Sequence, residues 1–257
     1  MSLCLDQFPF LCVPDPQLSM PERDMLGNLT GSRYSPGRFV KVRKRRYSTV
    51  AITNNLKGNQ RHVSAGVGLT ALDLLLKLNP YIFEVRGNYA YVDPFARIGR
   101  SPPPLVDCML TIELLSNPGH PHLHALFVTK SRKERLEERL LARGVTVELV
   151  NARSLSRVAL QNAARCYQTL LGLDIRTLKT ESRQFANVLL TDYERFREDD
   201  LTLDECMDAM AESVGCGIVN AFNLLCTAHA YGFVRIDPAH ELLPYRALHL
   251  EETHRES

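Results

Sequence analysis

The stretch ALFVTKSRKERLEERLLARGVTVELV, residues 125 to 150, places the strongest constraint on the fold of this chain. Its apolar start, ALFVT, is typical of a strand. The charged run after Ser131 is typical of a helix, because acidic and basic residues alternate at helical spacing. Gly144 is suited to end that helix in the left-handed conformation, and VTVELV predicts a further strand. The stretch therefore indicates an α/β fold, with Lys130 at the predicted end of its first strand.

The residues before this stretch predict another helix and a series of short strands. The segment VGLTALDLLLKLNP, from residue 67, places four leucines on one helical face. The strands YIFEVRG, NYAYVD, LVDCMLTIELL and HLHALFVT follow, with turns predicted at residues 87–88 and 117–119. A helix, a strand meander, a second helix and a last strand predict a mixed-sheet α/β domain.

We divide the chain into three regions. Residues 1–32 are rich in Pro, Asp and Ser without periodicity, which is typical of an extended arm. Residues 33–152 are predicted to form the mixed-sheet domain, and residues 153–257 a mainly helical domain. With 257 residues, of which 45% are apolar, the chain is large enough to bury two ordinary hydrophobic cores.

The mainly helical region predicts four helices and a hairpin. Helices are expected in SLSRVALQNAARCYQTLLG and TESRQFANVLLTDYERFRE, then in a short segment opened by a capping box of Thr202 and Glu205. The fourth is expected from about Gly217 to Tyr231, with Gly232 ending it. FVRID follows as a strand, with RALHL as its partner. Two helices before a hairpin indicate a winged-helix-like domain, which often binds DNA, but the fourth helix has no Lys or Arg, so we favour a protein-interaction role.

Charge and cysteine content restrict the class of protein. The net charge is only +2, yet the segment from Arg33 to Tyr47 contains seven basic residues and no acidic one, which suits phosphate binding. No segment reaches the roughly 18 apolar residues of a membrane span, and the start of the sequence has no basic leader, so we expect a cytoplasmic protein. Seven cysteines without a CxxC pair predict reduced thiols.

Asp107 and Lys130 form a pattern found in metal-dependent nucleases. These enzymes commonly place an acid on one strand of a hairpin and an acid-x-lysine at the end of the next strand. Two carboxylates then hold Mg²⁺, and the lysine orients or activates the attacking water. Asp107 lies in LVDCML, and the strand predicted to end at Lys130 follows after a turn. The pattern predicts a nuclease-type site with Asp107 as a metal ligand.

The order of features resembles the TnsA family, the endonuclease subunits of heteromeric transposases that cut the 5′ ends of a transposon. The resemblance covers about residues 38–250 and rests on KVRKRRYS at 41–48, VGLTALDLLLKLNPYIFEVRGN at 67–88, LVDCML at 105–110, FVTK at 127–130 and YGFVRID at 231–237. It implies a restriction-endonuclease-like fold of the PD-(D/E)xK type, followed by a winged-helix-like C-terminal domain. It also implies three partners: double-stranded DNA of transposon ends, a TnsB-like transposase and a TnsC-like AAA+ ATPase.

The catalytic set of this family is incomplete in the present sequence. Aligned on VGLTAL, the family's helical glutamate falls on Gly68, and the Gln or Glu of its QVK- or EVK-type strand end falls on Val128. Asp107 and Lys130 remain, and one carboxylate holds Mg²⁺ poorly because this ion requires several well-placed oxygens. We therefore expect a TnsA-like subunit with impaired or absent cleavage, for which Mg²⁺ or Mn²⁺ is a cofactor only if it is active.

Two alternatives stay open. The first is an active Mg²⁺-dependent endonuclease that cuts 5′ transposon ends with Asp107, Lys130 and an acid not yet identified. Asp73 is an unconvincing substitute because it is rotated by about 140° from Gly68 around a helix, and Glu113 lies near the far end of its strand. The second alternative is a non-catalytic, winged-helix DNA-binding regulator.

Basic side chains near the start of the α/β domain are expected to contact DNA phosphates under each of these hypotheses. Binding should then weaken steeply with salt. The residues are Arg38, Lys41, Arg43, Lys44, Arg45, Arg46, Lys57 and Arg61.

The HPHLH run presents a possible second site. It places His120, His122 and His124 at alternate positions, which share one side of a strand. Three histidines are a suitable ligand set for Zn²⁺, but the first two flank Pro121 in the predicted turn. Whether the run binds a metal or is a solvated turn stays open.

Overall fold

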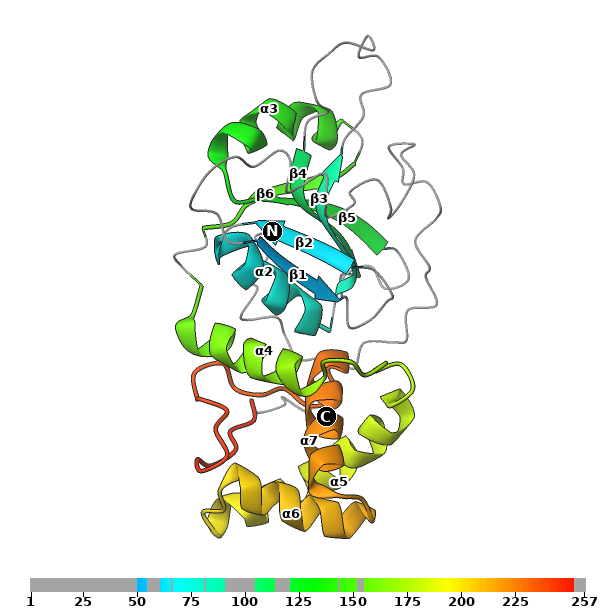
Figure 1. Ribbon diagram of the computed structural model, residues 1–257, viewed down its shortest axis with the longest axis vertical. Helices are drawn as coiled ribbons and strands as arrows, with labels where there is room; N and C mark the ends of the chain where they lie inside the picture. Colours follow the sequence, from blue (N-terminus) through cyan, green and yellow to red (C-terminus); the bar gives the residue numbers. More distant parts are fainter. Residues whose placement is uncertain are drawn as a thin grey trace, which may run out of the picture. The chain divides into compact units, whose positions relative to one another are not determined.

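The computed structural model describes residues 50–54, 61–65, 67–80, 82–90, 105–113, 121–142, 144–151 and 155–251. These residues form a mixed α/β architecture whose C-terminal part is mostly helical (Figure 1), so the predicted α/β class is confirmed. The chain divides into two compact units, with the main boundary between Ser154 and Leu155.

The first unit is built around a four-stranded sheet. Its strands are β3 (Ile82–Ala90), β4 (Leu105–Glu113), β5 (Pro121–Phe127) and β6 (Thr146–Leu149), in the spatial order β3-β4-β5-β6. The first three pair antiparallel, whereas β6 pairs parallel to β5 and is reached through helix α3 (Lys130–Leu141). Strands β1 (Val50–Asn54) and β2 (Arg61–Ala65) form a separate antiparallel pair, and helix α2 (Val67–Leu78) precedes β3. The mixed sheet therefore consists of a meander extended by one crossover.

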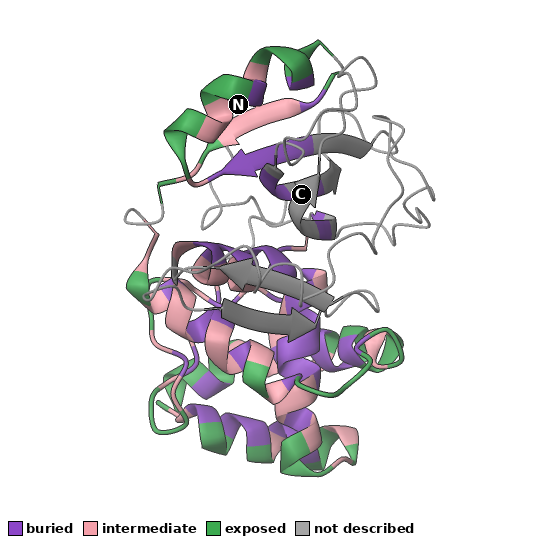
Figure 2. Cartoon of the chain, turned by 45° about the horizontal axis from the view of Figure 1, so that its top comes forward, coloured by how far each residue is buried: buried purple, intermediate pink, exposed green. Residues whose placement is uncertain are grey.

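Apolar residues at helical spacing explain how α2 and α3 pack. In α2, Leu69, Leu72 and Leu76 are buried, as their spacing predicts. In α3, the buried residues are Leu136 and Leu140, and most of the remaining helix surface is exposed (Figure 2). Full burial of one such side chain contributes about 1.5–3 kcal/mol. The cluster beneath α3 is completed by Val106, Ala125, Phe127 and Val145.

Strand β3 differs from the prediction of a turn at residues 87–88. It pairs with β4 on both sides of that dipeptide: Val85 lies opposite Leu110, and Tyr89 lies opposite Val106. A continuous ladder satisfies the backbone groups of both halves, so the pairing partner overrides the local turn propensity of Gly-Asn. The predicted pair of short strands is thus one long strand as far as Ala90.

The second unit contains the four predicted helices. They are α4 (Arg157–Thr169), α5 (Lys179–Glu198), α6 (Leu203–Val214) and α7 (Ile218–Tyr231). The capping box at the start of α6 is confirmed: Glu205 N donates to Thr202 Oγ1, and Thr202 N donates to Glu205 Oε2 at 2.9 Å. Gly232 ends α7 with φ 76°, a conformation that costs glycine little.

Helix α7 is the central packing helix of this unit. It contacts α4, α5 and α6. Its buried residues include Ala221, Leu224 and Leu225, whereas Ile218 and Val219 in the first turn are exposed. Among the described residues, no single helix has the length and apolar content to cross a membrane; α6 and α7 meet that test only together, as a pair bent by 98°.

The segment after α7 is called the C-terminal strap, residues 235–251. FVRID and RALHL, predicted as paired strands, meet in one antiparallel bridge between Ile236 and Leu250. The flanking bonds run from Asp237 N to His249 O and from Glu251 N to Arg235 O, both at 2.9 Å. The predicted pairing is present, but it is too short to form strands.

Candidate functional site

Asp107 is the centre of the candidate site. It lies in β4, next to Cys108, which pairs with Leu126 of β5, and its side chain is 0% exposed. Its Oδ2 accepts a hydrogen bond from Val128 N at 3.0 Å, and its Oδ1 accepts one from the guanidinium Nη1 of Arg132. Both carboxylate oxygens are therefore engaged by donors of this chain.

The start of α3 explains why Arg132 reaches this carboxylate. Strand β5 ends at Phe127, and the carbonyl of Thr129 accepts from Arg132 N at 3.1 Å and Lys133 N at 3.2 Å, which closes the first helical turn. Arg132 thus lies in the first turn of a helix that follows directly on the strand beside Asp107. The Arg132 side chain is 35% exposed, so it pairs with the buried Asp107 carboxylate while part of it contacts solvent.

Lys130 does not occupy the position predicted for it, and the expectation of a strand-end lysine is wrong. It is the first residue of α3, and its Nζ lies 3.6 Å from Glu134 Oε1, one helical turn further on. Its side chain is 78% exposed. Strand β5 ends three residues before Lys130, because α3 begins at Lys130 itself. There the lysine pairs with Glu134, four residues further along the helix. The cation at Asp107 comes from Arg132 instead.

The two positions at which the expected catalytic residues are missing lie on α2 and at the end of β5. Gly68 is in the first turn of α2 and is partly exposed. Val128 is likewise partly exposed, and its backbone N–H donates a hydrogen bond to the Asp107 carboxylate. Asp73, weighed as a substitute acid, is buried on α2 with 3% exposure. Glu113 is the last residue of β4, and only its backbone, paired with Pro121, is described.

These residues do not fit a nuclease-type Mg²⁺ site. Mg²⁺ is bound through carboxylates that present free oxygens in near-octahedral geometry, whereas the one placed carboxylate already pairs with Arg132. Across the described part of the chain, no group of three or more His, Cys, Asp or Glu side chains is arranged to hold a metal ion. The arrangement neutralises a buried carboxylate internally, and among the side chains that the structure describes no second acid contacts it.

The HPHLH histidines show no ligand set within the described residues. His124 is buried on β5, where it pairs with Leu110 and Thr146. His122 is described only by its backbone, which pairs with Ile112. His120 and the predicted turn at 117–119 lie outside the described residues.

Most of the predicted phosphate-binding residues also lie outside the described residues. These are Arg38, Lys41, Arg43, Lys44, Arg45, Arg46 and Lys57. Arg61 opens β2, where its backbone pairs with Asn54. The DNA-contact prediction therefore stays a prediction.

Arg132 is the residue that sequence reasoning missed. Alternating charges on a helix such as α3 are typical of a solvated face, which holds for Lys130 and Glu134 but not for Arg132. A usable signal was its place in the first helical turn after a strand that neighbours Asp107. An arginine in that turn is long enough to reach the end of the sheet, and its planar guanidinium is well suited to pair with a carboxylate such as that of Asp107.

No protein-family model matches this sequence, and the comparison with curated proteins gives no match either.

Proposed function

We propose that this chain is a TnsA-like subunit of a heteromeric DNA transposase, which binds transposon-end DNA in the cytoplasm without cutting its 5′ ends. In this role it bridges a TnsB-like transposase and a TnsC-like AAA+ ATPase. The observation that carries the non-cleaving part is the ion pair between Asp107 and Arg132. A carboxylate that is buried and paired inside the chain cannot also hold a catalytic cation without losing that partner.

The topology supports a restriction-endonuclease-like fold for the first unit. Helix α2, the β3-β4-β5 meander, helix α3 and the parallel strand β6 follow the order of elements that the resemblance implies. Asp107 and the residues after β5 meet at the sheet end, which is where such a site is expected. Under this proposal Asp107 has the position of a catalytic acid, but it forms a structural ion pair with Arg132.

The second unit supports a partner-binding role. Helices α6 and α7 followed by the Ile236–Leu250 bridge match the order of a winged-helix-like domain. Seven of the fourteen residues of α7 are buried, the helix packs against three neighbouring helices, and it contains no Lys or Arg, so it is poorly suited to enter the DNA groove. We therefore assign DNA contacts to the basic segment before β1 and partner contacts to this unit.

DNA binding is tested by fluorescence anisotropy with labelled transposon-end duplex at several salt concentrations. Arg45→Ala with Arg46→Ala is expected to weaken binding and to reduce the salt dependence by roughly two phosphate contacts, since each contributes a slope of about 0.9. The matched control is Arg195→Ala with Arg197→Ala, which removes the same charge from residues already paired with acids on α5. Equal weakening by both double variants would mean a nonspecific charge effect.

Partner binding is tested by co-purification with the transposase and the AAA+ ATPase encoded in the same element. The proposal predicts retention of both by the wild type, and retention by Asp107→Ala as well. A protein that binds neither end DNA nor the transposase contradicts the proposal.

A further inference from the structure

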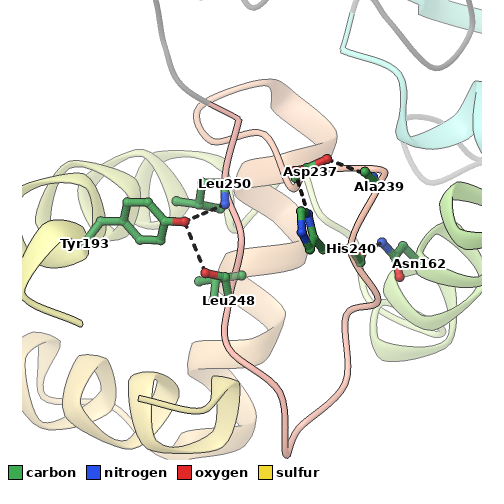
Figure 3. A network of polar contacts seen from close by, with 7 residues as sticks. All are labelled: Asn162, Tyr193, Asp237, Ala239, His240, Leu248 and Leu250. Atoms are coloured by element: carbon green, nitrogen blue, oxygen red, sulfur yellow. Dashed lines mark hydrogen bonds and ion pairs between the residues drawn. The ribbon is translucent and has the colours of Figure 1, made fainter. Parts of the chain in front are cut away.

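Side chains of α4 and α5 hold the C-terminal strap by hydrogen bonds to its backbone. Asn162 of α4 donates from Nδ2 to His240 O at 2.7 Å and accepts from Leu242 N at 2.8 Å (Figure 3). Tyr193 of α5 donates its hydroxyl to Leu248 O at 3.1 Å and accepts from Leu250 N at 2.8 Å. Asn162 and Tyr193 thus each donate to one carbonyl of the strap and accept from one of its N–H groups, as the backbone of a neighbouring strand would.

The strap also satisfies the N-terminus of α6. Leu203 N donates to Arg246 O at 2.7 Å, and Asp204 N donates to Pro244 O at 3.0 Å. The first N–H groups of a helix have no partner within the helix, so these carbonyls complete the cap that Thr202 begins. If the strap opens, these amide groups lose their partners.

A pair of stacked histidines lies within the strap. The His240 and His249 rings are 3.9 Å apart between centroids and are inclined by 21°. His240 Nδ1 lies 2.7 Å from Asp237 Oδ2, and Ala239 N donates to the other oxygen of the same carboxylate at 2.8 Å (Figure 3). The Asp237 carboxylate therefore contacts one imidazole of the stacked pair, that of His240, and a backbone N–H.

This geometry disfavours a proton on His249. Burial opposes ionisation of Asp237, but the hydrogen bonds from Ala239 N and His240 outweigh burial, and the pKa of Asp237 is lowered. Partial burial, together with the charge of His240, lowers the pKa of His249 despite the attraction of Asp237. The second imidazole is thus held neutral.

A third histidine connects α7 to the same segment. Ile236 N donates to His229 Nδ1 at 3.3 Å, so this ring nitrogen must be unprotonated in the closed arrangement. Protonation of Nδ1 would convert the acceptor into a donor and remove the bond. His229 therefore contributes in the same direction as His249, from a different element.

We propose that the C-terminal strap is a proton-sensitive latch: closed while His249 and His229 Nδ1 are neutral, and opened when they are protonated. The sign follows from linkage, because a group whose pKa is lowered in the closed state takes up a proton on opening. The stabilisation from neutral His249 is complete above the ordinary histidine pKa and is lost as the pH falls below it. Among the described residues, Asp237 is the charged group that acts on both imidazoles. Tyr193 of α5 and Glu251 interact with Asp237, and Glu251 pairs with Arg235. The further titratable and charged groups of the strap and its neighbouring helices are Glu241, Arg246, Arg165 of α4 and His229 of α7.

The latch is tested by hydrogen-exchange mass spectrometry of the full chain between pH 5 and pH 8, with exchange rates corrected for intrinsic pH dependence. In the wild type, the opening constant of peptides covering the strap should rise as the pH falls, by up to about tenfold per pH unit for each proton taken up. Peptides of α5 outside the strap contacts serve as the internal reference. NMR titration of the imidazole signals measures the proton uptake in the same protein.

His249→Phe keeps an aromatic ring in the stack and removes its charge, and His229→Gln keeps an acceptor for Ile236 N. The double variant is expected to keep the strap protected at low pH. Strap protection that does not change with pH in the wild type overturns the proposal, as does an identical pH dependence in wild type and double variant. If the double variant fails to fold, an NMR titration in which His249 protonates at or above the ordinary histidine pKa overturns it independently.

Discussion

The Asp107–Arg132 ion pair makes a sharp prediction about stability. In Arg132→Ala the carboxylate, which is 0% exposed in the wild type, keeps one donor, Val128 N, but loses its cation. Removing one partner of a fully buried pair costs about 3–5 kcal/mol. Because the Arg132 side chain is 35% exposed and water can partly replace it, we expect a loss of about 2–3 kcal/mol in the free energy of unfolding.

The reasoning is tested most sharply by a second substitution. If Arg132→Ala is destabilising because it leaves an uncompensated buried charge, then a neutral amide at position 107 should relieve that loss. Asn also keeps an oxygen that accepts from Val128 N. The double variant Asp107→Asn with Arg132→Ala is therefore expected to be more stable than Arg132→Ala alone, by about 1 kcal/mol or more.

Urea unfolding followed by far-ultraviolet circular dichroism measures these differences, since the chain contains no tryptophan. Hydrogen exchange of peptides from β4 and α3 assigns the loss to the first unit. Lys130→Ala is the matched control, because it removes a cation from the same helix turn but from an exposed pair with Glu134, worth at most about 0.5 kcal/mol. Equal effects of Arg132→Ala and Lys130→Ala, or no relief by Asp107→Asn, would refute the argument.

Three further predictions concern the second unit. Thr227 is buried, and its Oγ1 has no hydrogen-bond partner among the residues that the structure describes; Thr227→Val should leave the unfolding free energy unchanged or raise it by up to about 1 kcal/mol, and a clear loss in urea denaturation would contradict this. Thr202→Ala removes the cap of α6 and should cost about 1 kcal/mol. The side-chain and backbone bonds from Thr202 lower the pKa of Glu205, so the part of this stabilisation that needs ionised Glu205 is present above the ordinary glutamate pKa and disappears as the pH falls, whereas the cap bond from Glu205 N to Thr202 Oγ1 does not titrate; a loss of the same size at pH 2.5 and at pH 7 would be inconsistent with it. Tyr193→Phe leaves two strap backbone groups without a partner and should cost about 1–3 kcal/mol, visible as faster exchange at residues 248–250; unchanged exchange there would count against that role.

Local signals predicted the helical unit well. The helices of this unit depend on apolar spacing, and their ends depend on residues such as Thr202, Glu205 and Gly232, whose effect acts within a few residues. The α/β class was predicted from the strand and helix patterns for the same reason. Where a single residue type determines the backbone conformation, as with the left-handed Gly144, the sequence is sufficient to predict that conformation.

Long-range pairing accounts for what the sequence did not predict. Residues 87–88 have strong turn propensity, and only the β4 ladder holds them in a strand. The partner of Asp107 lies 25 positions away in Arg132, and Asn162 reaches His240 over 78 positions. Such contacts depend on how elements pack, and periodicity within one element does not encode them. The candidate acid was therefore found from its motif, whereas its actual cation was not.

The measurement that tests the central claim most directly is cleavage of DNA carrying a transposon end, with the transposase of the same element present, in Mg²⁺ and in Mn²⁺. Wild type, Asp107→Ala and the double variant Gly68→Glu with Arg132→Ala are compared. A non-cleaving subunit predicts that wild type and Asp107→Ala give the same background at the 5′ ends. Metal-dependent 5′ cutting by the wild type that Asp107→Ala abolishes would contradict it, because Asp107 would then bind a catalytic metal in place of Arg132.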